Sequence, residues 1–291
     1  MSTQPAAPAS GPFFLAAEPG QRFCLLHAPL GGCRGAVVYI HPFAEEMNKS
    51  RRVAAEQARA LAATGFAVLQ IDLLGCGDSS GDFADARWDA WKADVVAAID
   101  WLAARYPAPL TLLGLRLGGL LALDVAHTGT RQLARVVLWN PVQSGATYLK
   151  QFLRLLTVNE MLADERSSGQ SAPAPSSNAR DALLAGTSLE VAGYELAPAL
   201  ALAIEVCDAA RLPVTSCPVD WIETVSSLER PEAPAITRLA DKWRTAGVAV
   251  QLHRVVGPAF WATQEIEQAP ALVAATTTLL AEAAQLPRAA A

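Results

Sequence analysis

The chain has 291 residues, a formal net charge of −5 and 52% hydrophobic residues. This length suits one large domain with an insertion, or two small domains. The acidic balance gives no basic footprint for nucleic acid or for an anionic membrane, and no uninterrupted apolar run is long enough for a transmembrane helix. We therefore expect a soluble globular protein that binds no nucleic acid.

The cysteines are odd in number, widely spaced and without a CxxC pair. This pattern argues against a disulfide framework and against a zinc site, so we expect neither metal nor cofactor and a cytoplasmic location. Residues 1–12 have no positive cluster and no apolar signal-peptide core, and we expect a disordered tail there. The cysteines are Cys24, Cys33, Cys76, Cys207 and Cys217.

Apolar runs typical of buried strands alternate with helical stretches along the chain, which predicts an α/β fold with a mostly parallel central sheet flanked by helices. Strands are expected at 23–27, 36–40, 67–71, 110–113, 136–139, 219–225 and 248–256. Helices are expected at 50–64, 88–105, 117–127, 152–156, 236–246 and from about 266 onward.

The alternation is interrupted over residues 143–212, where the composition changes. A Ser/Pro/Ala/Gly-rich stretch at 167–178 can bury little surface, and we expect it to be flexible. We interpret 143–212 as a helical lid inserted into one core domain, which consists of residues 13–142 and 213–291.

A strand–turn–helix pattern at residues 111–123, TLLGLRLGGLLAL, carries the strongest motif. Its turn matches the G-x-S-x-G nucleophile elbow of α/β-hydrolases, with Gly114 and Gly118 at the glycine positions. The central residue is Arg116 rather than serine. A guanidinium has five donors and no acceptor and stays protonated, so it can be neither nucleophile nor general base.

Two interpretations of Arg116 follow. Either it forms a purely structural salt bridge in a degenerate site, or it binds the carboxylate or phosphate of an anionic ligand. A buried arginine needs a counter-ion, and Glu45 and Glu46 are the expected partners. Alternatively, residues 46–52 form only the solvated first turn of a helix.

The other members of a Ser-His-Asp triad are also in doubt. The final predicted strand runs into Gly257-Pro258-Ala259-Phe260-Trp261 without a histidine, and His253 comes several residues too early. We expect Trp261 to line the pocket instead. For the triad acid, one candidate strand ends at Asn140, and the next offers Glu223 or Glu229 at uncertain register.

Two other strand ends supply polar candidates. In the loop HPFAEEMNKSRR at 41–52, His41 should point toward the ligand crevice. By analogy with the fold, the backbone N–H groups of Phe43 and Leu117 would form an oxyanion hole. The turn DLLGCGDSSG at 72–81 places Cys76 near His41, so a thiolate–imidazole pair is one hypothesis and a purely structural turn is the other.

The segments HPFAEEMNKSRR, DLLGCGDSSGDFADARWDAW, GLRLGG and VVGPAFWATQEIEQAP resemble the exosortase A system-associated hydrolase 2 family. The resemblance covers nearly the whole chain and is weakest in the predicted lid. It implies an α/β-hydrolase fold, a bacterial setting and an association with exopolysaccharide synthesis. It does not imply a reaction, because a fold does not establish a function.

Two functional hypotheses remain open at this point. The first is hydrolysis of an ester or thioester by a non-standard site that uses His41 with Cys76 or an activated water. The second is a pseudohydrolase that binds an anionic small ligand or a partner protein. A conventional serine enzyme acting through Ser79 ranks third. The predicted ligand-binding residues are Phe43, Glu45, Glu46, Arg116, Leu117 and Trp261.

Overall fold

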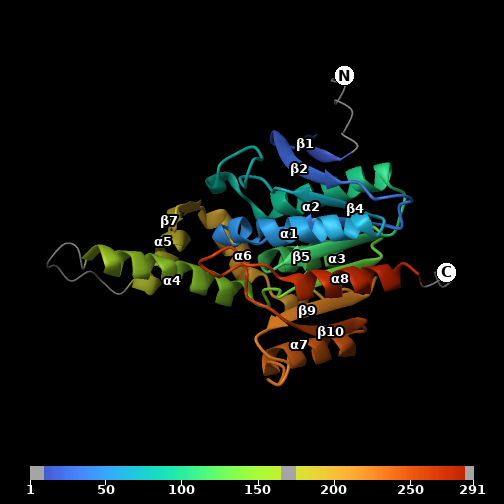
Figure 1. Ribbon diagram of the computed structural model, residues 1–291. Coiled ribbons are helices and arrows are strands. Elements are labelled where there is room, and N and C mark those ends of the chain that lie inside the picture. The colour runs from blue at the N-terminus through green and yellow to red at the C-terminus, as the bar shows by residue number, and fades with distance from the viewer. Residues whose placement is uncertain (1–9, 165–174, 286–291) are drawn as a thin grey trace.

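The computed structural model describes residues 10–164 and 175–285, and an eight-stranded sheet runs through it (Figure 1). The strand order is β1-β2-β4-β3-β5-β6-β9-β10; the six strands from β4 to β10 are parallel, and β1 and β2 are antiparallel. This confirms the predicted fold class. The strands are β1 (Gly11–Ala16), β2 (Gln21–His27), β3 (Gly35–Ile40), β4 (Phe66–Ile71), β5 (Leu110–Leu115), β6 (Arg135–Trp139), β9 (Val219–Val225) and β10 (Val250–Val256).

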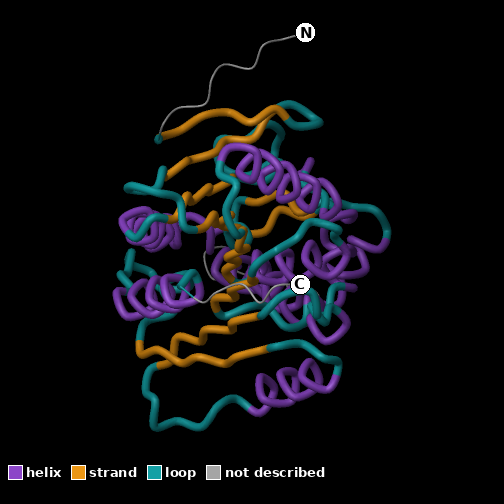
Figure 2. Tube along the Cα trace, turned by 90° about the vertical axis from the view of Figure 1, so that its right-hand side faces the viewer, coloured by secondary structure: helices purple, strands orange, loops and turns teal. Residues whose placement is uncertain are grey.

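Helices cover both faces of the sheet (Figure 2). One face packs against α1 (Glu45–Ala63) and α8 (Pro270–Ala283), and the other against α2 (Trp88–Arg105), α3 (Leu117–Thr128) and α7 (Pro234–Thr245). Strands β3 and β5 are buried along their whole length. This explains why they read as continuous apolar runs instead of alternating ones.

Several boundaries differ from the sequence prediction, among them the starts of β1 and of α1. Strand β1 begins at Gly11, inside the predicted tail, because Phe13 stacks on Trp101 of α2 with ring centroids 4.5 Å apart. Residues 1–9 of the predicted tail lie outside the described residues. Helix α1 begins at Glu45 rather than at residue 50, after Ala44 with φ 50°.

A buried ion pair fastens the β1–β2 hairpin to the core. Arg22 Nε donates to Asp94 Oδ1 of α2 at 2.7 Å, and both side chains are buried. The other Asp94 oxygen accepts the backbone N–H of Leu74 at 2.8 Å. The pair therefore joins β2, α2 and the turn that contains Cys76.

The segment between β6 and β9 contains α4 (Gly145–Asp164), α5 (Pro175–Leu184), β7 (Leu189–Val191), β8 (Tyr194–Leu196) and α6 (Pro198–Val206). Helix α4 extends away from the sheet in Figure 1. Most of the stretch predicted to be flexible, 167–178, lies outside the described residues, and α5 begins at Pro175. The role of residues 143–212 as a lid stays a prediction.

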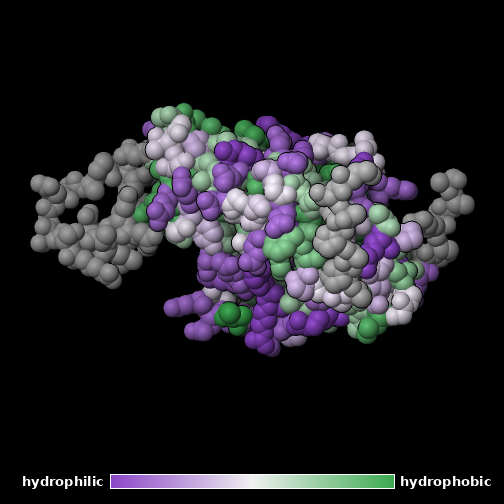
Figure 3. All heavy atoms as spheres, turned by 90° about the horizontal axis from the view of Figure 1, so that it is seen from above, coloured by the Kyte–Doolittle hydropathy of each residue, from purple (hydrophilic) through white to green (hydrophobic). Residues whose placement is uncertain are grey.

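The surface seen from the β1–β2 side mixes polar and apolar residues, with hydrophilic side chains over much of it (Figure 3). None of the helices within 10–164 and 175–285 is long and apolar enough to cross a membrane.

The glycines of the elbow allow α3 to pack directly against the strand ends. A Cβ at Gly118 would lie 2.4 Å from the carbonyl oxygens of both Ile40 and His41. We expect Gly118→Ala to lower the free energy of unfolding by about 3 kcal/mol or more, since backbone cannot move aside as a flexible side chain can.

Urea denaturation of Gly118→Ala would measure this loss. Gly257→Ala is the matched control, because its Cβ would meet only Thr224 Cγ2 at 3.7 Å. Equal stability of the two variants would contradict the tight packing at the elbow.

Candidate functional site

The nucleophile elbow is kept in shape although its central residue has changed. Strand β5 leads into α3 through Arg116, whose backbone has φ 55° and ψ −118°. Such a positive φ is uncommon for a residue with a side chain and marks a constrained turn. A Cβ at Gly114 would lie 2.4 Å from the carbonyl oxygen of Gly118, so the close approach of strand and helix requires glycine.

Arg116 is held by contacts from four other parts of the chain. Its Nε donates to Glu46 Oε1 at 3.3 Å, and its Nη1 donates to the carbonyl oxygen of Asn140 at 3.2 Å. The guanidinium also lies 5.8 Å from the ring centroid of Tyr148 and 5.3 Å from that of Trp261. These distances suit cation–π contacts that fix the plane of the guanidinium.

Only one of the two predicted glutamates faces Arg116. Glu46 makes the pair, whereas Glu45 is exposed and accepts hydrogen bonds from Asn48 at 3.2 Å and from the Tyr194 hydroxyl at 3.3 Å. The two residues are consecutive in α1, so their side chains leave the helix about 100° apart. The sequence could not choose between them.

Glu46 has a second partner in Tyr148 of α4, whose hydroxyl donates to Oε2 at 3.0 Å. Burial raises the pKa of Glu46, while Arg116 and the Tyr148 hydrogen bond oppose that rise. Burial and the neighbouring Glu46 carboxylate also raise the pKa of Tyr148, which keeps it a neutral donor. Sequence reasoning missed Tyr148, because nothing local marks a tyrosine that contacts a residue 102 positions away.

An open pocket of about 360 Å³ lies beside Arg116. Its polar lining comes from the loop after β6 and from the first turns of α4, and Ala235 of α7 closes another side. Amides and hydroxyls of this kind donate and accept hydrogen bonds without carrying charge. The polar lining residues are Arg116, Gln143, Ser144, Thr147, Tyr148 and Gln151.

Neither candidate for the triad acid is paired with a histidine in the described part of the chain. Glu223 accepts hydrogen bonds from Asn140 Nδ2 at 2.8 Å and from Trp221 Nε1 at 2.5 Å, and Glu229 is exposed. Burial raises the pKa of Glu223. His253 pairs with Asp220 at 2.8 Å. Within the described part of the chain, neither Glu223 nor Glu229 is hydrogen-bonded to a histidine.

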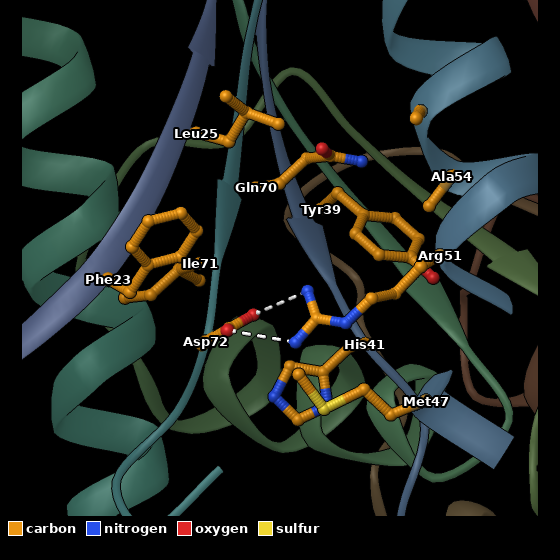
Figure 4. A pocket seen from close by; sticks show the side chains of 11 residues that line it. Phe23, Leu25, Tyr39, His41, Met47, Arg51, Ala54, Gln70, Ile71 and Asp72 are labelled. Atoms are coloured by element: carbon orange, nitrogen blue, oxygen red, sulfur yellow. Dashed lines mark hydrogen bonds and ion pairs between the residues drawn. The ribbon is translucent and has the colours of Figure 1, made fainter. Parts of the chain in front are cut away.

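His41 lies at the end of β3, as expected, but both of its ring nitrogens are occupied by backbone groups. Nε2 accepts the N–H of Leu73 at 3.2 Å, so Nδ1 carries the proton and donates to the carbonyl of Pro42 at 2.7 Å. Burial lowers the pKa of His41. Figure 4 shows its ring beside the ion pair between Arg51 and Asp72, at the edge of a cavity of about 210 Å³.

Cys76 is buried, and burial raises the pKa of its thiol far above the usual range, with further increases from Asp72 and Asp94. No hydrogen bond joins Cys76 to His41 among the described residues. The raised pKa and the absence of this contact argue against a thiolate–imidazole pair, which stays a prediction.

The two predicted oxyanion donors lie close to each other. Phe43 and Leu117 line one small apolar cavity of about 10 Å³, and neither backbone N–H donates a hydrogen bond within the described residues. The Phe43 ring packs edge-on against Phe152 of α4, with centroids 4.9 Å apart. The cavity has room for about one water molecule.

The geometry agrees with comparisons to known proteins. A family model described as serine aminopeptidase, S33, matches residues 31–182, more than half of the chain. The protein belongs to this S33 α/β-hydrolase family. The elbow of this chain has Arg116 at the position of the serine to which the family's description refers.

Among curated relatives, the mitochondrial palmitoyl-protein thioesterase ABHD10 of Rattus norvegicus is 30% identical over 102 residues, which are 35% of this chain and 33% of that protein. The Mus musculus protein matches over the same shares. The match thus spans about a third of the length of these relatives.

Solved structures agree with the fold over nearly the whole chain. Est1E from Butyrivibrio proteoclasticus with bound ferulic acid superposes with a TM-score of 0.66 and 15% identity, covering 93% of this chain and 98% of its own. A thermostable carboxyl esterase from Bacillus coagulans gives 0.63 at 15% identity, covering 96% and 100%. Mouse ABHD10 gives 0.56 at 16% identity, covering 94% and 99%. At such identities, likeness shows the fold alone.

In this S33-family chain, the place of the triad histidine after β10 holds Phe260 and Trp261. Phe260 is fully buried against Trp139, with centroids 6.4 Å apart, and Trp261 turns toward Arg116. Trp261, predicted to line the pocket, therefore packs against the Arg116 guanidinium.

Because burial keeps the Cys76 thiol protonated, we expect it to be unreactive toward Ellman's reagent in the native protein at about pH 8. Cys76→Ala should leave the number of rapidly labelled thiols unchanged. Cys33→Ala is the control, since Cys33 is only partly buried and its loss should reduce labelling. Rapid labelling that disappears in Cys76→Ala would contradict this prediction and would support a reactive Cys76.

Proposed function

We propose that this chain is a binding protein with a hydrolase fold that takes up a small anionic ligand at Arg116. We also propose that it acts in the bacterial exosortase and exopolysaccharide system, with which the family that its sequence resembles is associated. One observation carries the proposal. A guanidinium stands where the nucleophile would be, at the wall of an open polar pocket, and only two of its five donors are used by described residues.

The pocket suggests the chemical class of the ligand. Nη2 of Arg116 has no partner among the described residues, and together with Nη1 it offers a planar edge that matches a carboxylate. The neutral side chains around it, Gln143, Ser144, Thr147 and Gln151, suit hydroxyl groups better than an acyl chain. We therefore propose a hydroxylated carboxylate, such as a sugar acid.

A loss of affinity on changing Arg116 tests this proposal. We expect Arg116→Ala to weaken binding of D-glucuronate by about tenfold to a hundredfold, the usual effect of losing hydrogen bonds to a charged group. Arg116→Lys should retain part of the affinity, because lysine keeps the charge but lacks the planar fork. Isothermal titration calorimetry measures both effects.

Arg131→Ala is the matched control, because Arg131 makes an exposed pair with Asp100 outside the pocket. Glucose, which lacks the carboxylate, should not bind. Equal affinities of Arg116→Ala and wild type for D-glucuronate would overturn the proposal.

A second candidate function is hydrolysis of an ester or thioester through Cys76 or an activated water with His41. The partial match to palmitoyl-protein thioesterases favours this candidate. Against it stand the burial of Cys76, which raises the pKa of its thiol, and the two backbone groups that occupy the ring nitrogens of His41.

We expect wild type to turn over neither aryl esters nor acyl thioesters of short or long chain. Wild-type turnover that is lost in Cys76→Ala would instead establish the second candidate. Turnover that appears only in Arg116→Ser would show that Phe43 and Leu117 still provide an oxyanion hole. In that case the wild type would lack only the serine nucleophile at the elbow.

A further inference from the structure

The carboxylate of Glu46 already occupies one edge of Arg116. It lies on the Nε side of the guanidinium at 3.3 Å, and the ligand edge formed by Nη1 and Nη2 belongs to the same group. A bound anion and Glu46 would therefore share one positive charge. The Arg116 and Glu46 side chains are only 22% and 20% exposed, so water screens them weakly.

Few other charges face this pair. Lys49 lies on α1 and acts on Glu46 from a distance, and Glu223 of β9 acts on Arg116 in the same way. From α4, the group that faces Glu46 is the neutral hydroxyl of Tyr148. Among the described residues, Arg116 and Lys49 thus balance Glu46 and Glu223 before any ligand binds, and an added anion leaves one negative charge in excess.

We propose that Glu46 sets the charge of the ligand accepted at Arg116, so that an anion binds together with one proton, which Glu46 takes up. This inference rests on the proposed function. The proton comes from solvent and adds to a carboxylate oxygen of Glu46, and no covalent bond of the ligand changes.

The surroundings of Glu46 suit such an uptake. Burial already favours its neutral form, and a second anion on Arg116 would favour it further. The neutral acid keeps an oxygen acceptor for the Tyr148 hydroxyl, so α4 stays in place. Protonation of Glu46 also weakens its ion pair with Arg116 Nε, so that this N–H becomes a further donor for the ligand.

Proton uptake fixes the sign of the pH dependence. The protonated form binds the anion better, so affinity rises as pH falls between the Glu46 pKa of the complex and that of the free protein. The rise is at most about tenfold per pH unit, which corresponds to one proton. It levels off outside this interval.

The test uses Glu46→Gln, which keeps the shape of the side chain and, like the protonated acid, has one accepting oxygen and one donor group, but cannot ionise. D-glucuronate, whose carboxyl is ionised throughout, is titrated by calorimetry from about pH 8 to about pH 6 in two cationic buffers of different protonation enthalpy. We expect wild type to take up one proton on binding, and Glu46→Gln to bind about tenfold tighter at the alkaline end without pH dependence.

Glu45→Gln is the matched control, since the neighbouring Glu45 is exposed and contacts Asn48 and Tyr194 instead of Arg116. It should behave as wild type. Binding to wild type without proton uptake, or an unchanged pH profile in Glu46→Gln, would overturn the inference and leave the proposed function standing. Binding by Glu46→Gln alone would support both. Absence of binding in every variant at every pH would overturn the proposed function and the inference with it.

Discussion

The pairing of Arg116 with Glu46 is the interaction on which this site depends. The elbow forces residue 116 into a left-handed backbone conformation at the carboxyl edge of a parallel sheet, where a positive charge is costly without a partner. Helix α1 supplies that partner because it begins at Glu45, directly after β3 and its loop. The pair thus links the turn after β5 to the turn after β3.

The same pair brings other elements to the site. Tyr148 of α4 binds the second oxygen of Glu46, and its ring lies against both the guanidinium and Phe43. Trp261, in the loop after β10, closes another side of the guanidinium. Residues from four separated segments therefore meet at Arg116, where a serine enzyme would gather its triad.

The backbone packing of the elbow does not depend on the side chains that carry the chemistry. The glycine contacts of the elbow and the paired positions of Phe43 and Leu117 follow from packing of α3 against the strand ends, and they are present although residue 116 is an arginine. The nucleophile and the histidine are single side chains and can be replaced without disturbing that packing. In this chain of the S33 family, the same packing surrounds an arginine where the elbow motif has its serine.

The sequence by itself determined the fold class and the character of the elbow. The buried runs at β3, β4, β5 and β9, the glycines beside Arg116 and the lack of a histidine after β10 are local patterns, and local periodicity and turn chemistry suffice to interpret them. Only the tertiary structure decided which glutamate faces Arg116, that Tyr148 and the Asn140 carbonyl join it, and that both nitrogens of His41 are occupied. The contacts of Arg116 with Glu46 and of Glu46 with Tyr148 span 70 and 102 positions. Such contacts depend on how helices and loops pack around the sheet, and no local pattern records that packing.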